Sequence, residues 1–245
     1  DAEQCRAVLP NPVDWIIVDH YGLDYKWESI MRDRCNHIMV IDDLADRSHD
    51  CDLLLDQNLG RTVDDYCAFV SLGTRMLLGP KYALLRPEFA QWRNTSLARR
   101  QNPELRHLLV AMGGVDQSNV TGSILAAIAK CRLAILEKIT VVLGLHAPWH
   151  SAVCDLAAEM QVPTTIMSGV DNMAELMTSC DLAIGAGGAT TWERCSLGVP
   201  TILINLAANQ KFISQEVNRT GAVILCDVAQ LDCELEKILC FASEP

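Results

Sequence analysis

Residues 182–193 read Leu-Ala-Ile-Gly-Ala-Gly-Gly-Ala-Thr-Thr-Trp-Glu, a short apolar run that leads through a glycine turn into a helical pattern. The apolar run predicts a buried strand over 182–184. A helix is predicted over 189–197, because the Gly198 and Pro200 that follow are typical helix stop signals. A strand that passes through a glycine turn into a helix is typical of a parallel α/β sheet, and this indicates the fold class.

Short apolar runs alternate with amphipathic stretches along both halves of the chain. After residue 105 the runs are separated by clear helical patterns, such as the apolar stripe of Val120, Ile124, Ile128 and Cys131. Before residue 91 the spacing leaves room for short helices only. The predicted strands are 15–18, 37–41, 53–55 and 76–78, then 108–112, 139–143, 164–166, 182–184 and 201–204, with a last helix over 231–241.

This alternation predicts an α/β protein with two Rossmann-like domains, each built on a parallel sheet. Segment 91–106 is polar, positively charged and poor in apolar residues, so the domain boundary is expected there. The first domain is then 1–90, the linker 91–106 and the second domain 107–245. The first domain is expected to be truncated, since a doubly wound domain normally opens with a strand and a glycine-rich turn, and neither occurs before residue 10.

The composition narrows the range of partners. The 245 residues are 50% hydrophobic and carry 20 Lys and Arg against 31 Asp and Glu, a net charge of −11. This charge disfavours nucleic acid and anionic membranes as partners, because both require a basic surface. No apolar run approaches the roughly 18 residues of a membrane span. The eleven cysteines stand singly, without a C-x-x-C pair, which is typical of reduced thiols in a cytoplasmic protein. A soluble monomer without a cofactor is expected.

Two glycine pairs, Gly113-Gly114 and Gly187-Gly188, follow predicted strands of the second domain. Ligands of open parallel sheets bind at the carboxyl ends of the strands. Glycine lets backbone amides approach an anion, and the start of the next helix adds unpaired N–H groups, so the two turns together predict a diphosphate site. The alternative for each turn is tight packing alone. A dinucleotide fingerprint is excluded, because its third glycine would stand where Thr190 is, and no P-loop motif occurs.

Three side chains near predicted strand ends are candidates for chemistry. Glu193 lies one turn into the predicted helix and is placed to accept both hydroxyls of a ribose; its alternative role is to stabilise the helix dipole. His20 and Tyr21 follow the strand 15–18, and a histidine there is a candidate base, or else a structural residue. Asp42-Asp43 resembles a metal-binding pair but lacks evident partners, so no metal site is predicted.

Several blocks of the sequence occur in an order that resembles a known family. They read Ile-Ile-Val-Asp-His-Tyr-Gly-Leu-Asp over 16–24, Ile-Asp-Asp-Leu-Ala-Asp-Arg over 41–47, Asp-Leu-Leu-Leu-Asp-Gln-Asn over 52–58 and Leu-Gly-Pro-Lys-Tyr-Ala-Leu-Leu-Arg-Pro-Glu-Phe over 78–89. They resemble the UDP-2,4-diacetamido-2,4,6-trideoxy-β-L-altropyranose hydrolases of bacterial pseudaminic acid synthesis. Segments 111–116 and 185–193 extend the likeness, and the second domain is also similar to the UDP-binding half of the lipid II N-acetylglucosaminyltransferase.

The resemblance implies a GT-B architecture, with two Rossmann-like domains facing across a cleft and UDP held by the second. It implies that the turn containing Val170 and Met173 brackets uracil through its backbone, and that Glu193 binds the ribose hydroxyls. The remaining implied contacts are Gly113, Gly114, Gly187, Gly188, Ala189 and Thr190 for the diphosphate, with Asn209 and Gln210 for the sugar.

The implied reaction is hydrolysis of a UDP-sugar, in which water attacks the anomeric carbon, inverts it and releases UDP. Tyr21 matches an active-site tyrosine of the family, and His20 is the other candidate. The family carries a Gly-x-Gly-His-x-x-Arg turn whose histidine is the expected base, and this motif is absent here, so an upstream segment is expected. Two alternatives remain: a glycosyltransferase on the same fold, or a chain that binds UDP without turning it over.

Overall fold

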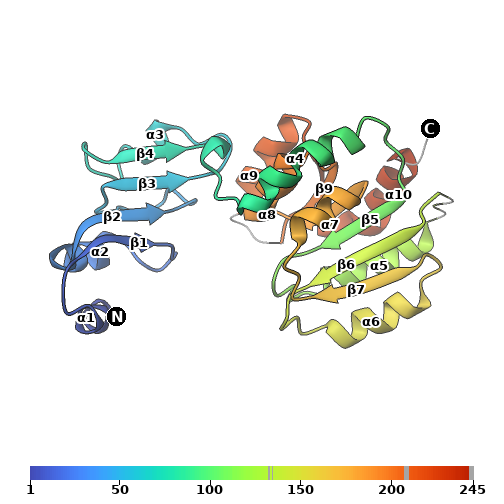
Figure 1. The fold of residues 1–245 in the computed structure, drawn as a ribbon, viewed down its shortest axis with the longest axis horizontal. Helices are drawn as coiled ribbons and strands as arrows, with labels where there is room; N and C mark the ends of the chain where they lie inside the picture. Colours follow the sequence, from blue (N-terminus) through green and yellow to red (C-terminus); the bar gives the residue numbers. More distant parts are fainter. Residues whose placement is uncertain (132, 134, 207–209, 243–245) are drawn as a thin grey trace. The chain divides into compact units, whose positions relative to one another are not determined.

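The protein divides into two compact units, Asp1–Leu84 and Leu85–Pro245. The computed structural model describes residues 1–131, 133, 135–206 and 210–242 (Figure 1). Both units consist of a parallel sheet with helices, as the alternating sequence pattern predicts.

The first unit is a four-stranded parallel sheet in the order β1-β2-β3-β4. Its core lies on the side of Ile38, Leu54 and Tyr66, all fully buried. Trp15 and Ile17 of β1 remain 47% and 63% exposed, so this edge strand is only partly covered within the unit. The elements are α1 (Ala2–Val8), β1 (Val13–Val18), α2 (Tyr25–Met31), β2 (Cys35–Ile41), β3 (Leu53–Asp56), α3 (Val63–Tyr66) and β4 (Arg75–Leu78), with single-turn helices at Arg32–Arg34 and Pro80–Tyr82.

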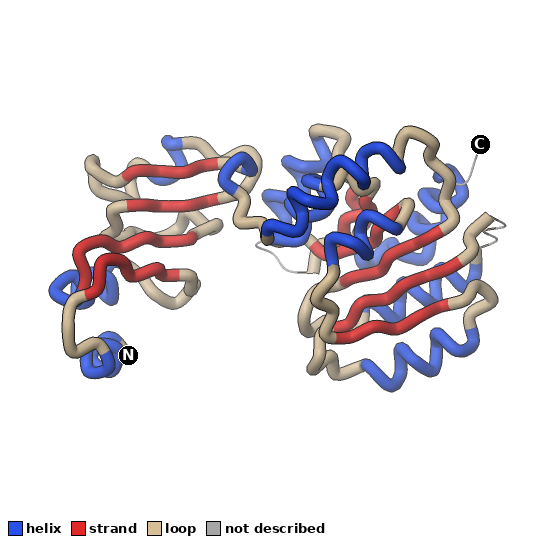
Figure 2. Tube along the Cα trace, in the orientation of Figure 1, coloured by secondary structure: helices blue, strands red, loops and turns tan. Residues whose placement is uncertain are grey.

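The second unit is built on a parallel sheet with the strand order β10-β9-β8-β5-β6-β7. One face packs on α5, α6 and α10, and the other on α4, α7 and the end of α8 (Figure 2). The strands are β5 (His107–Ala111), β6 (Lys138–Leu143), β7 (Thr164–Ser168), β8 (Leu182–Ala186), β9 (Thr201–Ile204) and β10 (Ile224–Cys226). The helices are α4 (Pro87–Arg99), α5 (Val120–Lys130), α6 (His150–Glu159), α7 (Met173–Ser179), α8 (Ala189–Ser196), α9 (Gln210–Arg219) and α10 (Leu231–Ala242), with a single-turn helix at Val228–Gln230.

The order of the strands determines where a ligand is expected. The chain builds outward from β5 through β6 to β7, then returns to the other side of β5 with β8, β9 and β10. The direction of winding therefore reverses between β5 and β8. In doubly wound sheets the crevice at this reversal, at the carboxyl ends of the strands, is the ligand site.

Segment 91–106, predicted to be a linker, is largely part of a helix of the second unit in the structure. Residues up to Arg99 continue α4, which starts at Pro87 and belongs to the second unit. Ser96 Oγ donates to the Leu197 carbonyl oxygen at 2.7 Å, and Arg100 donates to the Met177 carbonyl oxygen at 2.9 Å. The polar composition of this segment thus reflects a helix with a solvated outer face, and the division between units falls at Leu84.

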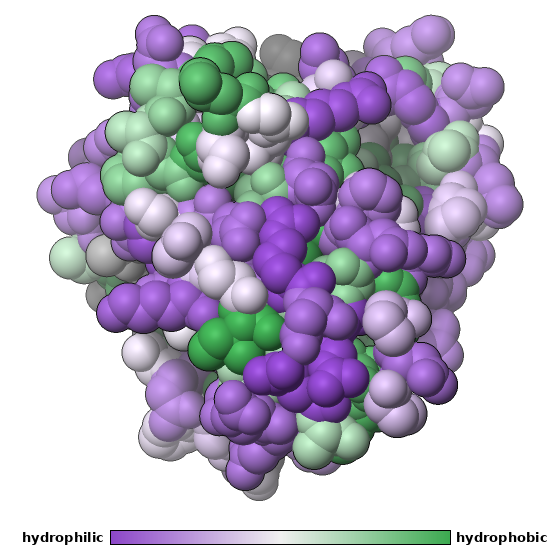
Figure 3. All heavy atoms as spheres, turned by 90° about the vertical axis from the view of Figure 1, so that its left-hand side faces the viewer, coloured by the Kyte–Doolittle hydropathy of each residue, from purple (hydrophilic) through white to green (hydrophobic). Residues whose placement is uncertain are grey.

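Within the described ranges, no helix combines the length and the apolar character needed to cross a membrane. The face drawn in Figure 3 is mainly hydrophilic, and its hydrophobic side chains gather only in small groups. All eleven cysteines are free thiols, among which Cys35, Cys51, Cys180 and Cys226 are buried.

Candidate functional site

The two glycine turns leave the second sheet at the same place. Ala111 of β5 pairs with Gly185 of β8, so these neighbouring strands end at the same level. Gly113-Gly114 follows β5 and Gly187-Gly188 follows β8, at the reversal of strand order. The structure therefore brings together the two turns that the sequence predicts for a diphosphate.

The turn into α8 presents an open helix end. Gly188 has a φ of 122°, a conformation that favours glycine, and as the N-cap residue of α8 it has no side chain with which to cap the helix. The Gly187 N–H donates a hydrogen bond to the Ile204 carbonyl oxygen at 3.2 Å. Ala189 is exposed and Thr190 is half-buried at the first turn. Uncapped amides and the positive end of the helix dipole suit an anion at this point.

The turn into α5 is different, because an acidic side chain already occupies that helix end. The Asp116 carboxylate accepts the N–H groups of Val120 and Thr121, both at 2.8 Å, and Asn119 Oδ1 accepts the Gly122 N–H at 3.2 Å. The expectation that both glycine turns offer an open helix end is therefore wrong for α5. Gly113-Gly114 is exposed and offers only its own backbone to a ligand.

Glu193 lies one turn into α8 and is half-buried. Burial raises the pKa of Glu193, and the nearby positive charge of Arg86 opposes this rise. Arg86 Nη2 also pairs with Glu88 at 2.9 Å, and Arg86 Nη1 donates to the Asp171 carbonyl oxygen at 3.4 Å. Arg86 thus joins the Glu193 region to the loop after β7, and sequence reasoning did not select it as a site residue.

That loop contains the turn expected to bracket uracil. Gly169 has a φ of 64°, and Val170 and Met173 pack partly into the core beside α4 and α7. Arg86 holds the loop by its hydrogen bond to Asp171. The loop backbone is therefore held by Arg86 and by packing against the core. Val170 and Met173 remain only half-buried.

Gln210, expected at the sugar, lies beside the α8 turn. A Cβ on Gly187 would lie 3.2 Å from the Cβ of Gln210, so the two residues are in close contact. Gln210 Oε1 accepts the Leu206 N–H at 3.0 Å, which fixes the side chain at the start of α9. Asn209, the other residue expected at the sugar, lies outside the described residues.

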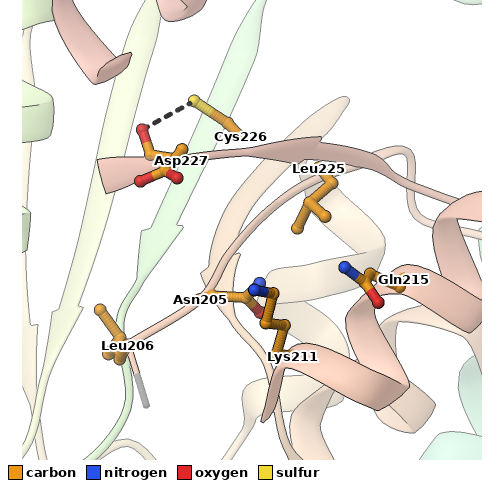
Figure 4. Close-up of a pocket in the computed structure, with 7 residues that line it drawn as sticks. All are labelled: Asn205, Leu206, Lys211, Gln215, Leu225, Cys226 and Asp227. Carbon is orange, nitrogen blue, oxygen red and sulfur yellow. Dashed lines mark hydrogen bonds between the residues drawn. The ribbon is translucent and has the colours of Figure 1, made fainter. Parts of the chain in front are cut away.

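A pocket of about 390 Å³ opens at the carboxyl ends of β9 and β10. The Lys211 side chain extends toward Asn205 in it (Figure 4), and Asn205 Oδ1 is buried with no hydrogen-bond partner among the described residues. The pocket adjoins the start of α9, next to Gln210, and has polar and apolar walls. Its lining residues are Asn205, Leu206, Lys211, Gln215, Leu225, Cys226 and Asp227.

The candidates of the first unit follow β1. The Tyr21 hydroxyl donates to Asp43 Oδ2 at 3.2 Å, and burial raises the pKa of Asp43. His20 Nδ1 accepts the Gly22 N–H at 3.0 Å, which assigns the proton of the neutral ring to Nε2. The ring nitrogen lone pair that a base would use is thus engaged by the Gly22 backbone.

The carboxylates behind Tyr21 form an internal network. The Tyr66 hydroxyl lies 2.8 Å from Asp56 Oδ2 and 3.1 Å from Asp42 Oδ2. Asp42 pairs with Arg47 at 2.8 Å, and burial raises the pKa of Asp56 to about 6. In the part of the chain that the structure describes, no three His, Cys, Asp or Glu residues are grouped to hold a metal ion. Asp42 Oδ2 also accepts the N–H groups of Leu44 and Ala45, at 3.3 and 2.9 Å, so the network holds the loop that carries Asp43.

Residues 108–239, just over half of the chain, match the glycosyltransferase family 28 C-terminal domain. The chain belongs to this family. The family 28 match runs from β5 into α10, so it includes both glycine turns and Glu193.

Three similar proteins extend this result. An uncharacterized protein of Methanocaldococcus jannaschii is 29% identical over 200 residues, 78% of this chain and 40% of that protein. The UDP-2,4-diacetamido-2,4,6-trideoxy-beta-L-altropyranose hydrolase of Campylobacter jejuni is 28% identical over 132 residues, 54% of this chain and 46% of that enzyme. The MurG crystal structure of Acinetobacter baumannii has a TM-score of 0.62 at 14% identity, over 99% of this chain and 70% of that chain.

These comparisons confirm the predicted GT-B-like fold, with two parallel-sheet α/β units. They also show a distant sequence similarity between this chain and the Campylobacter jejuni hydrolase, whose family the sequence motifs resemble. The chain spans about half the length of the curated relatives it matches.

Proposed function

We propose that the second unit binds the UDP portion of a UDP-sugar, and that the protein hydrolyses a UDP-linked 2,4-diacetamido-2,4,6-trideoxy hexose in pseudaminic acid biosynthesis. The observation that carries the binding proposal is the uncapped glycine turn into α8 at the reversal of strand order, with Glu193 one turn further on. The sequence similarity to the Campylobacter enzyme supports the choice of UDP-sugar and of hydrolysis.

The binding roles follow from the chemistry of each element. The first N–H groups of α8, with the backbone of Gly188, hold the diphosphate beside Gly187, because N–H groups at a helix start and a helix dipole attract an anion. Glu193 accepts the ribose hydroxyls, and the loop carrying Val170 and Met173 holds the base. Gln210 lies beside Gly187 and contacts the sugar next to the diphosphate.

The reaction is a displacement at the anomeric carbon. Water forms a C–O bond on one face while the C–O bond to UDP breaks on the other, so the configuration inverts, and the water gives one proton to a base. Negative charge grows on the leaving diphosphate, and oriented amides at such a position stabilise the transition state by several kcal/mol, about 10²–10³ in rate. Tyr21, hydrogen-bonded to Asp43, is assigned to the sugar side of the reaction together with His20.

Incubating the protein with this UDP-sugar, and measuring UDP release and the anomeric configuration of the free sugar, tests the proposal. Free sugar of inverted configuration without any acceptor is the expected result. UDP release that requires an added hydroxyl acceptor would contradict hydrolysis. Binding of UDP without turnover would support only the nucleotide site, which calorimetric titration with UDP measures separately.

Transfer to a hydroxyl acceptor is the second candidate, because the matched family is one of glycosyltransferases. It uses the same UDP site and differs in what attacks the anomeric carbon. Product analysis with and without acceptors separates the two functions.

A further inference from the structure

Arg194, in the second turn of α8, carries a buried positive charge with no acidic partner among the residues that the structure describes. It is 2% exposed. Its Nη2 donates to the Ala186 carbonyl oxygen at 2.8 Å and to Thr191 Oγ1 at 3.4 Å, and its Nη1 donates to Thr190 Oγ1 at 3.3 Å. Its Nε has no hydrogen-bond partner in the described part of the chain. All these acceptors are neutral, and within the described chain no carboxylate forms a hydrogen bond or ion pair with the guanidinium.

Such a charge is costly for a folded protein. Removing a cation from water costs several kcal/mol unless a counter-charge compensates it. Burial lowers the pKa of Arg194 to about 10, and Glu193, the preceding residue, opposes this only in part and makes no ion pair with it. The guanidinium therefore stays protonated at neutral pH. In the unliganded protein its desolvation lowers the free energy of unfolding.

The position of the guanidinium relates this charge to the diphosphate turn. It bonds to Ala186, immediately before Gly187-Gly188, and to Thr190, immediately after the helix starts. It therefore lies behind the turn. Gly185 makes room for it, since a Cβ at that position would lie 2.4 Å from Arg194 Nη1.

We propose that Arg194 is a positioning residue whose buried charge is neutralised by the bound diphosphate, so that it favours a nucleoside diphosphate over a nucleoside. Because Thr190 Oγ1 accepts a hydrogen bond from Arg194, its own hydroxyl proton is directed away from the guanidinium and toward a phosphate oxygen. Arg194 thus acts without touching the ligand. The proposal rests on the proposed UDP site and deepens it.

Calorimetric titrations with uridine, UMP and UDP at one ionic strength test this role. The neutral variants Arg194→Met and Arg194→Gln are expected to lose roughly 10- to 100-fold in UDP affinity, less in UMP affinity, and almost nothing in uridine affinity. Arg194→Lys retains the charge and is expected to recover most of the preference for UDP over uridine. Both neutral variants are expected to melt within a few degrees of the parent, since the unliganded protein gains nothing from the charge.

Arg219→Met is the matched control. Arg219 lies on α9 of the same unit, its side chain is 71% exposed, and its loss changes the net charge by the same amount. It is expected to leave all three affinities unchanged.

Equal losses of uridine and UDP affinity in the neutral variants would overturn the proposal, because Arg194 would then only shape the turn. Failure of both neutral variants to fold would also overturn it, because the charge would then serve the fold. If the parent binds UDP and every variant binds it equally, the role of Arg194 is refuted while the proposed function stands. If the parent binds none of the three ligands, the proposed function itself is refuted.

Discussion

Replacing Glu193 by alanine is expected to weaken UDP binding through the ribose and not through the phosphates. The carboxylate is half-buried one turn into α8, and Arg86 lies close enough to favour its charged form. A ribose offers two adjacent hydroxyl donors, and a carboxylate accepts both. The alanine variant leaves these donors without their charged acceptor.

The magnitude follows from the burial of the site. Hydrogen bonds to a charged group contribute about 1.5–3 kcal/mol each, and water replaces part of this at a half-exposed position, so the expected loss is about 1–3 kcal/mol. This corresponds to a fall in affinity of roughly 5- to 150-fold. Protein stability is expected to change by only a few tenths of a kcal/mol, the usual contribution of an acidic residue near the start of a helix.

The assay is calorimetric titration of the parent and of Glu193→Ala with UDP and with 2′,3′-dideoxy-UDP. The parent is expected to prefer UDP, and the variant is expected to bind the two ligands almost equally. Glu159→Ala, an exposed acidic residue at the end of α6, serves as the control for the change in net charge.

An equal loss of affinity for both ligands would refute the ribose contact, since the missing hydroxyls would then make no difference. A variant that melts far below the parent but binds UDP normally would show that Glu193 only stabilises the helix.

Three further results are expected. Asp116→Ala leaves the buried N–H groups of Val120 and Thr121 unpaired, so thermal unfolding of the second unit is expected to show a loss of about 2 kcal/mol; an unchanged melting temperature would contradict this capping role. Burial raises the pKa of Asp56 to about 6 in the folded protein, against 3.8 in the unfolded chain. The contribution of Asp56 to the free energy of unfolding is therefore fully present below pH 3.8 and is lost as the pH rises through 6. Urea unfolding should show the parent losing roughly 2–3 kcal/mol over this interval, and Asp56→Asn should flatten the curve. UDP affinity in EDTA should equal that in magnesium, because amides and cations of the protein supply the positive potential; lost binding in EDTA would contradict this.

Much of the fold is predictable from the sequence because its strands are continuous apolar runs. The runs at 108–112 and 182–184 lie within a residue or two of β5 and β8. Strand β10 is missed, since Ile224–Cys226 is three residues long and follows the polar end of α9. Helix α4 is misread as a linker, because most of its residues face solvent and its few buried side chains, such as Phe89, make no long apolar stripe.

The candidate site is predictable only in its backbone features. Glycine turns after strands can be read directly, whereas the charges around them depend on long-range packing. An arginine inside an amphipathic helix is normally read as a solvent-exposed residue, so nothing in the sequence indicates that Arg194 is buried. The contact of Arg86 with Asp171 joins residues far apart in the chain. In the same way, the hydrogen bond that occupies His20 appears only once the turn is built.

The charges of the second unit explain how the proposed diphosphate site is compatible with a net charge of −11. The two glycine turns are not equivalent, because the Asp116 carboxylate caps α5, whereas the N-cap residue of α8 is Gly188, which has no side chain, and the Arg194 guanidinium lies beneath that turn. The guanidinium of Arg86 is a further positive charge, and it lies close enough to Glu193 of α8 to act on the pKa of that carboxyl. The positively charged groups of Arg194 and Arg86 therefore both lie beside α8. A diphosphate is expected to lie over α8, with Gly113-Gly114 as a neutral wall, and no basic patch on the surface is required.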